Sequence, residues 1–324
     1  MAVYLVTGAA GFIGSHVCGV LLREGHRVVG LDLALDGPER PLKEHRLQPL
    51  RAQPGFRFQT GDVRDRAALG TLWAEAGPFD GVINLAGLGG VRQSVADPWS
   101  YLETNTTGTL NLLDLCRAHG VPKFVLASTS SLYGRHNPRP YREDADTSRP
   151  LSPYAASKKA AEALCAAYHA IHGLDITIFR YFTVYGPAGR PGMAMFNFVQ
   201  WIVEGRPVTV FGDGSASRDF SYIDDIARGT VAGLRPLGYE TINLGSDRPV
   251  PVIEVIRRIE QLTGREARLE FQPAHPADAP ATWADITRAR TLLAWEPQVD
   301  PQEGIARLVR WYQEHRAWAC EIPT

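Results

Sequence analysis

Short apolar runs alternate with stretches of helical periodicity through the first two-thirds of the chain. Runs of strand length predict parallel strands at 3–6, 27–32, 56–60, 81–87, 122–128 and 175–181. Between them, apolar residues recur every three or four positions and predict helices over 12–22, 66–73, 98–116 and 153–172. This alternation is typical of an α/β fold with a Rossmann-like, doubly wound parallel sheet.

Two parts of the chain do not follow this alternation. Residues 33–54 are polar and contain prolines, so we interpret them as an exposed excursion. After residue 186 the predicted elements become shorter and richer in Pro and Gly. We therefore expect a first domain over 1–186 and a smaller C-terminal lobe over 187–324, with some segments crossing between them.

Three glycines follow the first predicted strand and precede the first predicted helix. Gly8, Gly11 and Gly14 are spaced Gly-x-x-Gly-x-x-Gly, which suits a tight turn, a close approach to a pyrophosphate and close packing of helix on strand. Asp32 ends the second strand, where a carboxylate would bind the ribose hydroxyls of NAD and repel the phosphate of NADP. The pattern predicts that residues 1–186 bind NAD.

Further strand ends supply candidate cofactor contacts. Asp62 follows the third strand, where it would either face the adenine or cap the next helix. The fourth strand ends in Leu85, Ala86 and Gly87, and its last two residues are small enough for a cofactor to pass close to the backbone. In open α/β sheets, ligands bind outside the carboxyl ends of the strands, so these positions belong to one crevice.

A tyrosine and a lysine stand four residues apart on one face of a predicted helix. A lysine beside a phenol stabilises the phenolate and can hold ribose hydroxyls, which makes Tyr154 a candidate general base and Lys158 its partner. Alone, Tyr-x-x-x-Lys more often marks a solvated helix face. Here the hydroxyl-rich segment 128–134 ends the fifth strand and opens toward the same crevice.

The chain resembles, over nearly its whole length, the extended short-chain dehydrogenase/reductase family, and within it the nucleotide-sugar epimerases and dehydratases. The resemblance rests on motifs at 7–14, 62–63, 84–86, 105–108, 154–158, 180–182 and 218–225. It implies an NAD-dependent enzyme in which Thr129, Tyr154 and Lys158 are catalytic. It also implies cofactor contacts by Gly8, Gly11, Phe12, Ile13, Gly14, Asp32, Asp62, Val63, Leu85, Ala86, Gly87, Asn105, Ser128, Tyr154, Lys158, Tyr181 and Val184.

Segments 87–92 and 182–194 resemble the subgroup that epimerises UDP-hexuronic acids at C4, converting UDP-glucuronate to UDP-galacturonate. Ala188 stands where that subgroup usually has Trp, and Gly192 where it usually has Asp. The resemblance implies substrate contacts by Arg92, Thr129, Ser130, Ser131, Thr183, Arg190, Met193, Phe211, Arg218 and Asp278. The alternatives are epimerisation of UDP-glucose to UDP-galactose, decarboxylation of UDP-glucuronate, and an NAD-binding regulatory protein of the same fold.

Several of these residues have a simpler reading. Arg218 could pair with Asp219 at the surface, and the hydroxyls near Thr129 could cap a strand end.

Other positions depart from the patterns of related enzymes. His275 replaces the usual Gln or Arg before Asp278. Ser130 and Ser131 replace the acidic residues of related dehydratases, and neither can act as the acid or base of water elimination.

Composition bears on the expected partners, metal content and location of the protein. A formal net charge of −1 over 324 residues gives no reason to expect a nucleic-acid partner, and no apolar stretch approaches membrane-spanning length. The four cysteines have no metal-binding spacing, so we expect free thiols, a cytoplasmic location and no metal. Two long apolar helices, over 98–116 and 153–172, are expected to pair with a second copy in a homodimer.

Overall fold

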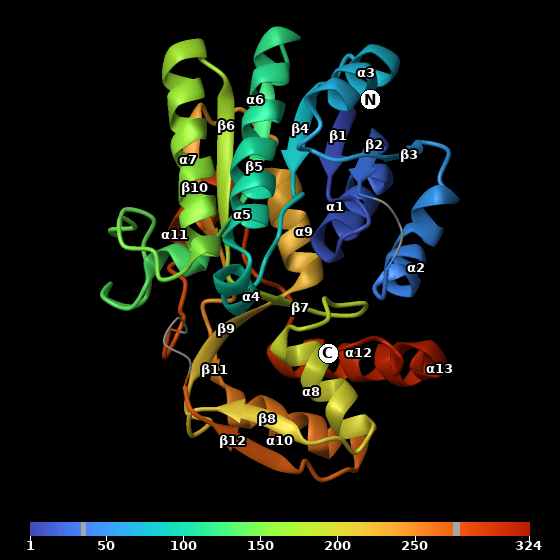
Figure 1. The fold of residues 1–324 in the computed structure, drawn as a ribbon, viewed down its shortest axis with the longest axis vertical. Helices are drawn as coiled ribbons and strands as arrows, with labels where there is room; N and C mark the ends of the chain where they lie inside the picture. Colours follow the sequence, from blue (N-terminus) through green and yellow to red (C-terminus); the bar gives the residue numbers. More distant parts are fainter. Residues whose placement is uncertain (34–36, 275–278) are drawn as a thin grey trace.

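The computed structural model describes residues 1–33, 37–274 and 279–324. Its centre is a parallel sheet of seven strands in the order β10-β6-β5-β4-β1-β2-β3 (Figure 1). The strands are β1 (Val3–Thr7), β2 (Arg27–Asp32), β3 (Phe56–Thr60), β4 (Gly81–Asn84), β5 (Lys123–Thr129), β6 (Asp175–Tyr181) and β10 (Tyr239–Leu244). The order reverses next to β1, so the sheet is doubly wound and the α/β prediction is confirmed.

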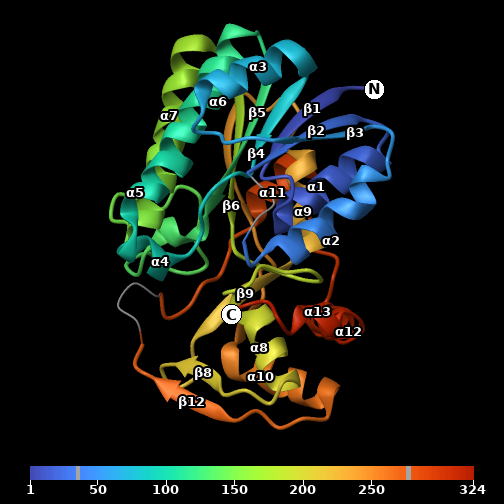
Figure 2. The ribbon, with the colours of Figure 1, turned by 45° about the vertical axis from the view of Figure 1, so that its right-hand side comes forward.

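Helices cover both faces of this sheet (Figure 2). Successive residues of a strand point to opposite faces, so a strand with consecutive apolar residues has apolar side chains to bury on both. On β1, Val6 packs in one core with α1 (Phe12–Arg23), α9 (Ile223–Ala232) and α11 (Thr287–Leu293). Leu5 packs in the other core, against α3 (Arg66–Ala76), α6 (Gly108–Ala118) and α7 (Pro153–His172). β1 is therefore apolar on both faces.

The helix expected over 98–116 is interrupted. It consists of α5 (Pro98–Tyr101), a π-helical segment η1 (Leu102–Thr107) and α6. Within the wide turn, the backbone carbonyl of Asn105 accepts from the hydroxyl of Thr109 at 2.7 Å. Such π-helical turns commonly mark functional positions, and here the turn carries Asn105 toward Ser157 on α7.

The stretch over 33–54 is not wholly an exposed excursion. It contains α2 (Arg40–Arg51), with Pro41 in its first turn, and Leu42, Leu47 and Leu50 of this helix are buried. Proline is tolerated in the first turn of a helix because the amide it lacks would have no intrahelical partner. The prediction was wrong because the polar residues of α2 masked its narrow apolar stripe.

A smaller lobe lies beyond the carboxyl ends of the strands, below the sheet in Figure 1. It contains the sheet β11-β9-β7, the pair β12-β8 and a core of its own. Its elements are β7 (Thr183–Tyr185), α8 (Ala194–Val203), β8 (Val208–Phe211), β9 (Ser217–Tyr222), β11 (Pro249–Pro251), α10 (Val252–Thr263), β12 (Leu269–Gln272), α12 (Pro301–Glu314) and α13 (Arg316–Ala319). Between β9 and α12 the chain returns to the large sheet to form α9, β10 and α11.

All four cysteines are free thiols, and three of them are buried. Within the described residues, no helix is both long enough and apolar enough to cross a membrane. The same part of the chain holds no group of three or more His, Cys, Asp or Glu side chains placed to bind a metal.

Candidate active site

A cleft of about 710 Å³ runs along the carboxyl ends of the strands, facing the smaller lobe. Most of the predicted site residues line it. On the cofactor side these are Gly8, Gly11, Phe12, Ile13, Gly14, Asp32, Asp62, Val63, Leu85, Ala86, Gly87, Ser128, Tyr181 and Val184. Further along the cleft are Thr129, Ser130, Ser131, Tyr154, Lys158, Thr183, Arg190 and Met193. Residues from many separate segments of the chain thus meet in one place.

The glycine loop has the tight geometry that a dinucleotide requires. Gly8 has φ +71°, and a Cβ there would lie 2.8 Å from the backbone nitrogen of Ala86. A Cβ on Gly14 would overlap the carbonyl oxygen of Gly8. The loop therefore leaves the backbone bare where α1 begins, and a helix N-terminus favours the negative charge of a diphosphate.

Asp32 stands at the end of β2, and both of its carboxylate oxygens have partners. The amide of Ala10 donates to Oδ2 at 2.9 Å, and the ammonium of Lys43 donates to Oδ1 at 2.9 Å. Asp32 thereby fixes the glycine loop to α2. A carboxylate held here fits the ribose of NAD, so the residues present suit this cofactor.

Asp62 lines the cleft and does not cap α3. Asp65 is the N-cap of that helix and accepts from the amide of Ala68 at 3.0 Å. The carboxylate of Asp62 is held by Arg64, whose hydrogen bonds are the main reason that its pKa is lowered. Of the two sequence interpretations for Asp62, the N-cap is wrong.

The catalytic candidates form a row between α7 and the end of β5. The side chain of Lys158 is buried, and its ammonium donates to the carbonyl of Ala127 at 3.0 Å. Burial lowers the pKa of Lys158 to about 8. Burial raises the pKa of the half-buried Tyr154, while its hydrogen bond with Thr129 and the charge of Arg190 act in the opposite direction. Arg190 is thus a cation that lowers the pKa of Tyr154.

Gly87, in the lining of the cleft, lies against this row. A Cβ at Gly87 would lie 2.9 Å from the ammonium of Lys158 and 2.8 Å from the amide oxygen of Asn105. Asn105 is not among the cleft-lining residues. Its side chain accepts from the amide of Leu88 at 2.8 Å and donates to the hydroxyl of Ser157 at 2.9 Å. Asn105 thus links the loop after β4, at Leu88, to α7 without lining the cleft itself.

The hydroxyl groups at the end of β5 divide between local and cleft-directed contacts. The hydroxyl of Thr129 accepts from the amide of Ser131 at 3.1 Å, which caps the turn η2 (Ser130–Tyr133). The same side chain contacts Tyr154. Ser130, Ser131 and Thr183 are half-buried and line the cleft. Strand-end capping therefore accounts for part of the role of Thr129 and leaves the other hydroxyls facing the cleft.

Other predicted substrate residues lie outside this lining. The guanidinium of Arg92, on α4 (Val91–Ala96), lies 3.5 Å from the ring centre of Phe211 on β8, so the two close on each other between the lobes. Arg218 donates to the carbonyl of Ser217 at 2.9 Å. The neighbouring Asp219 is buried and accepts from amides of Ser246, Asp247 and Ala284. His275 and Asp278 lie outside the described residues.

Helix α2 supplies two cations that the sequence interpretation missed. Lys43 and Arg46 both line the cleft. Arg46 is buried and donates to the carbonyls of Ala188 at 2.8 Å, Gly189 at 2.9 Å and Ala10 at 3.3 Å. It ties the glycine loop to the loop that carries Arg190. The signal available was the spacing of the three buried leucines, which places both cations away from solvent.

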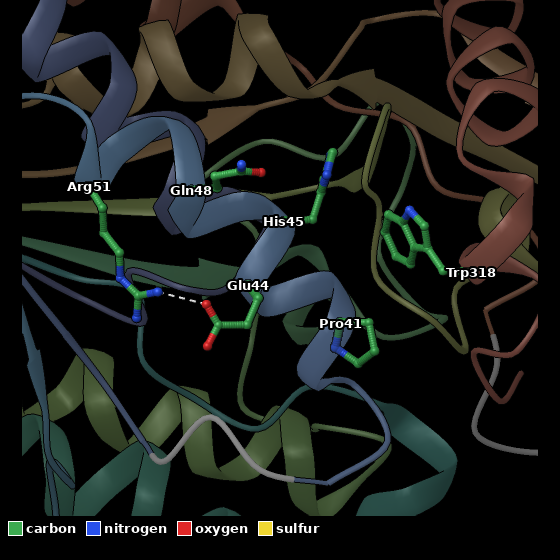
Figure 3. A pocket seen from close by; sticks show the side chains of 6 residues that line it. All are labelled: Pro41, Glu44, His45, Gln48, Arg51 and Trp318. Atoms are coloured by element: carbon green, nitrogen blue, oxygen red, sulfur yellow. Dashed lines mark hydrogen bonds and ion pairs between the residues drawn. The ribbon is translucent and has the colours of Figure 1, made fainter.

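The opposite side of α2 borders a second, smaller groove of about 420 Å³ (Figure 3). It is lined by Pro41, Glu44, His45, Gln48, Arg51 and Trp318. In Figure 3, Glu44 and Arg51 pair along the helix, and Trp318 stands across from His45. The ring of His45 also accepts from the indole of Trp311 at 3.2 Å. This groove holds none of the predicted site residues and joins α2 to the C-terminal helices.

Comparisons with known proteins agree on one family. The sequence profile of the NAD dependent epimerase/dehydratase family matches residues 4–245. A UDP-glucuronate 4-epimerase of Thermodesulfobacterium geofontis is 50% identical over 316 residues, 97% of each chain.

Solved structures agree with this match. The UDP-glucuronic acid 4-epimerase of Bacillus cereus, in complex with UDP-glucuronic acid and NAD, is 38% identical with a TM-score of 0.90. The match covers 97% of this chain and 99% of that one. A UDP-glucose 4-epimerase of Thermotoga maritima is 30% identical with a TM-score of 0.89, over 97% and 99% of the two chains. The chain belongs to the NAD dependent epimerase/dehydratase family.

Proposed function

We propose that this protein catalyses the reversible C4 epimerisation of UDP-glucuronate and UDP-galacturonate with NAD as a resident cofactor. The observation that carries the proposal is the cleft in which Tyr154 and Lys158 face a row of hydroxyls and a glycine loop. The identity of 50% to a UDP-glucuronate 4-epimerase supports the same reaction. NAD, when bound, supplies the acceptor and donor of the hydride of sugar C4.

The side chains of the catalytic row have separate tasks in this proposal. Tyr154 takes the proton of the C4 hydroxyl and later returns it to the product. Thr129 hydrogen-bonds the same oxygen, and its contact with Tyr154 supports this role. Arg190 and Lys158 provide the positive charge that favours the phenolate. The 4-keto sugar turns about its bond to the diphosphate, so that it is reduced on its other face.

The carboxylate of the substrate explains the hydroxyls around this row. Oxidation of C4 in a hexuronate gives a β-keto acid, which loses CO₂ when its carboxylate bond stands perpendicular to the carbonyl plane. Ser130, Ser131 and Thr183 line the cleft and can hold the carboxylate near that plane through charge-assisted hydrogen bonds. Serines at 130 and 131 also leave no acid or base there for eliminating water.

The remaining candidates are assigned to the nucleotide end of the substrate. Phe211 belongs to the uracil side, and Arg218 and Arg92 to the diphosphate, for which a planar guanidinium is suited. Asp278 is proposed to bind the uridine ribose. The contact between Arg92 and Phe211 supports a placement where the two lobes face each other.

Incubation of the purified protein with UDP-glucuronate and with UDP-glucose, followed by separation of the products, tests the proposal. We expect UDP-galacturonate from the first substrate at a kcat/KM at least about tenfold above that for UDP-glucose, or about 1.4 kcal/mol in transition-state binding. A preference for UDP-glucose would contradict the role given to the hydroxyls. UDP-xylose and CO₂ from the unaltered protein would make it a decarboxylase.

We further propose that the protein is a homodimer that pairs through α6 and α7, which lie side by side in Figure 1. Large apolar side chains on this side are exposed, including Trp99 (73%), Ile171 (73%), Leu102 (39%) and Leu110 (37%). Exposed apolar groups of this size, distributed along one layer of helices, favour an interface. Light scattering should give a mass twice that of the 35.6 kDa chain. The variant Leu110→Lys should lower the measured mass to that of a single chain.

A cytoplasmic location is proposed on the state of the cysteines. Cys18, Cys116 and Cys165 are buried free thiols, the usual state in a reducing compartment. Fractionation of cells that produce the protein, with its activity followed in each fraction, tests this location.

A further inference from the structure

A buried ion pair lies behind the catalytic row and has no part in the mechanism above. Glu162 on α7 is 5% exposed and Arg180 on β6 is 4% exposed. The guanidinium donates to both carboxylate oxygens, from Nε at 3.0 Å and from Nη2 at 2.9 Å. A buried ion pair is often no more stabilising than apolar side chains of the same volume. Simple packing therefore does not explain this pair.

Glu162 belongs to a row of α7 residues that contacts three successive residues at the end of β5. Positions 154, 158 and 162 of α7 are four residues apart and share one helix face. Tyr154 contacts Thr129, and Lys158 donates to the carbonyl of Ala127. The hydroxyl of Ser128 donates to Oε1 of Glu162 at 2.6 Å. Three successive strand residues, ending at the catalytic threonine, are thus held by one row of the helix.

Arg180 anchors this row to the rest of the fold. Its Nη1 donates to the hydroxyl of Tyr133 at 3.1 Å and to the backbone carbonyl of Glu143 at 3.0 Å. The hydroxyl of Tyr133 in turn donates to the side chain of Asn243 at 2.6 Å. The two hydrogen bonds from Arg180 thereby fix the buried carboxylate of Glu162 in place.

We propose that Glu162 is a positioning residue of the epimerase reaction, which fixes the end of β5 through Ser128 and places its carboxylate one helical turn from Lys158 on the same face of α7. This inference rests on the proposed function. Burial of Lys158 lowers its pKa, and the carboxylate of Glu162 raises it. Other groups that face this pair are Tyr154 and Cys165 on α7, Arg180 on β6, Tyr133 in η2, Tyr239 on β10, and Arg190 beside Tyr154.

The chain allows the ionisation of Lys158 to be measured directly, because it has only four lysines, at 43, 123, 158 and 159. Lysine labelled with ¹³C at Cε gives four resonances in the protein as purified, and Lys158→Arg identifies the one of interest. Glu162→Gln retains the shape and the acceptor for Ser128 but removes the charge. We expect it to lower the pKa of Lys158 by about one unit, a tenfold change in its protonation equilibrium.

Glu143→Gln is the matched control. Glu143 is a buried carboxylate in the same region, but it accepts from the amide of Asn243 at 2.9 Å and contacts Arg180 only through its backbone carbonyl. We expect this variant to leave the pKa of Lys158 unchanged even if it unfolds more easily. An unchanged pKa in Glu162→Gln, or an equal shift in both variants, would overturn the proposal.

Epimerase rates supply the second readout. In Glu162→Gln the alkaline limb of kcat should move to lower pH together with the NMR pKa, and in Glu143→Gln it should stay in place. If Glu162→Gln does not fold, Glu162→Asp keeps the charge while shortening the reach to Ser128. That variant should have a lower kcat and a nearly unchanged pKa of Lys158. A pKa that falls by a full unit in Glu162→Asp would contradict the proposal. Absence of epimerase activity in the unaltered protein would instead disprove the proposed function and leave the NMR comparison intact.

Discussion

Replacing Arg46 by methionine separates the role of α2 from that of the catalytic row. The guanidinium of Arg46 bonds the carbonyls of Ala10, Ala188 and Gly189, and thus joins the glycine loop to the loop before Arg190. Methionine has a similar length and fills the space without donating a hydrogen bond. Arg46→Met therefore leaves three buried carbonyls without this partner.

The expected loss of stability follows from two opposing effects. Burial lowers the pKa of Arg46 to about 10, a depression of roughly two units or more, so burying its charge costs about 3 kcal/mol. Hydrogen bonds from a charged donor contribute about 1.5–3 kcal/mol each, or about 4–9 kcal/mol for three carbonyls. Subtracting the burial cost from the hydrogen-bond contribution gives an expected loss of about 2 kcal/mol in the free energy of unfolding. This value lies near the lower end of the resulting range because water in the cleft can reach part of the site.

The assay compares Arg46→Met with Arg51→Met on the same helix. The Arg51 ion pair with Glu44 is exposed, so its loss should change the free energy of unfolding by less than about 1 kcal/mol. Arg46→Met should also raise KM for UDP-glucuronate on the order of tenfold, or about 1.4 kcal/mol, because Arg190 is no longer held. Equal stability and equal KM in the two variants would refute the reasoning.

The remaining predictions concern the catalytic row and the cofactor. Tyr154→Phe should reduce turnover by about 10²–10⁴-fold while NAD stays bound, and near-normal turnover would contradict the role of the phenol. Because the pKa of Lys158 is lowered to about 8, epimerase activity should fall as the pH rises through 8. Over the same range the folded protein should gain stability, since the cost of burying the charged lysine disappears; Lys158→Met should lack this gain. Denaturation should release NAD and not NADP because of Asp32, and recovery of mostly NADP would refute this. Thr183→Val should slow epimerisation and release CO₂; a slow variant without CO₂ would remove Thr183 from control of the carboxylate.

Local patterns were sufficient to predict six of the seven strands of the large sheet, and β10, which lies in the part of the chain assigned to the smaller lobe, was missed. β3 spans Phe56–Thr60 and β6 spans Asp175–Tyr181, as expected, because the first begins with alternating apolar and polar residues and the second is largely apolar. The glycine spacing and the tyrosine-lysine spacing likewise report backbone geometry that each residue type requires. Parallel topology then brings the carboxyl ends of these strands to one cleft.

Long-range contacts of polar side chains were beyond such patterns. Arg46 meets Ala188 across 142 residues of chain, and no periodicity encodes this pairing. The π-helical turn at Asn105 has no distinct apolar signature, and it arises within a helix pattern that looks continuous. Arg190, from a different element, lowers the pKa of Tyr154, and the tyrosine-lysine pattern alone could not reveal this second cation beside Lys158.

The central claim is that sugar C4 is oxidised and then reduced within one active site, and epimerisation in D₂O tests it directly. NMR of the product made from UDP-glucuronate reports both the configuration at C4 and any deuterium bound to carbon. We predict UDP-galacturonate with the original hydrogen retained at C4 and no solvent deuterium at C4 or C5. Deuterium at either carbon, or UDP-glucuronate left unchanged, would contradict this account.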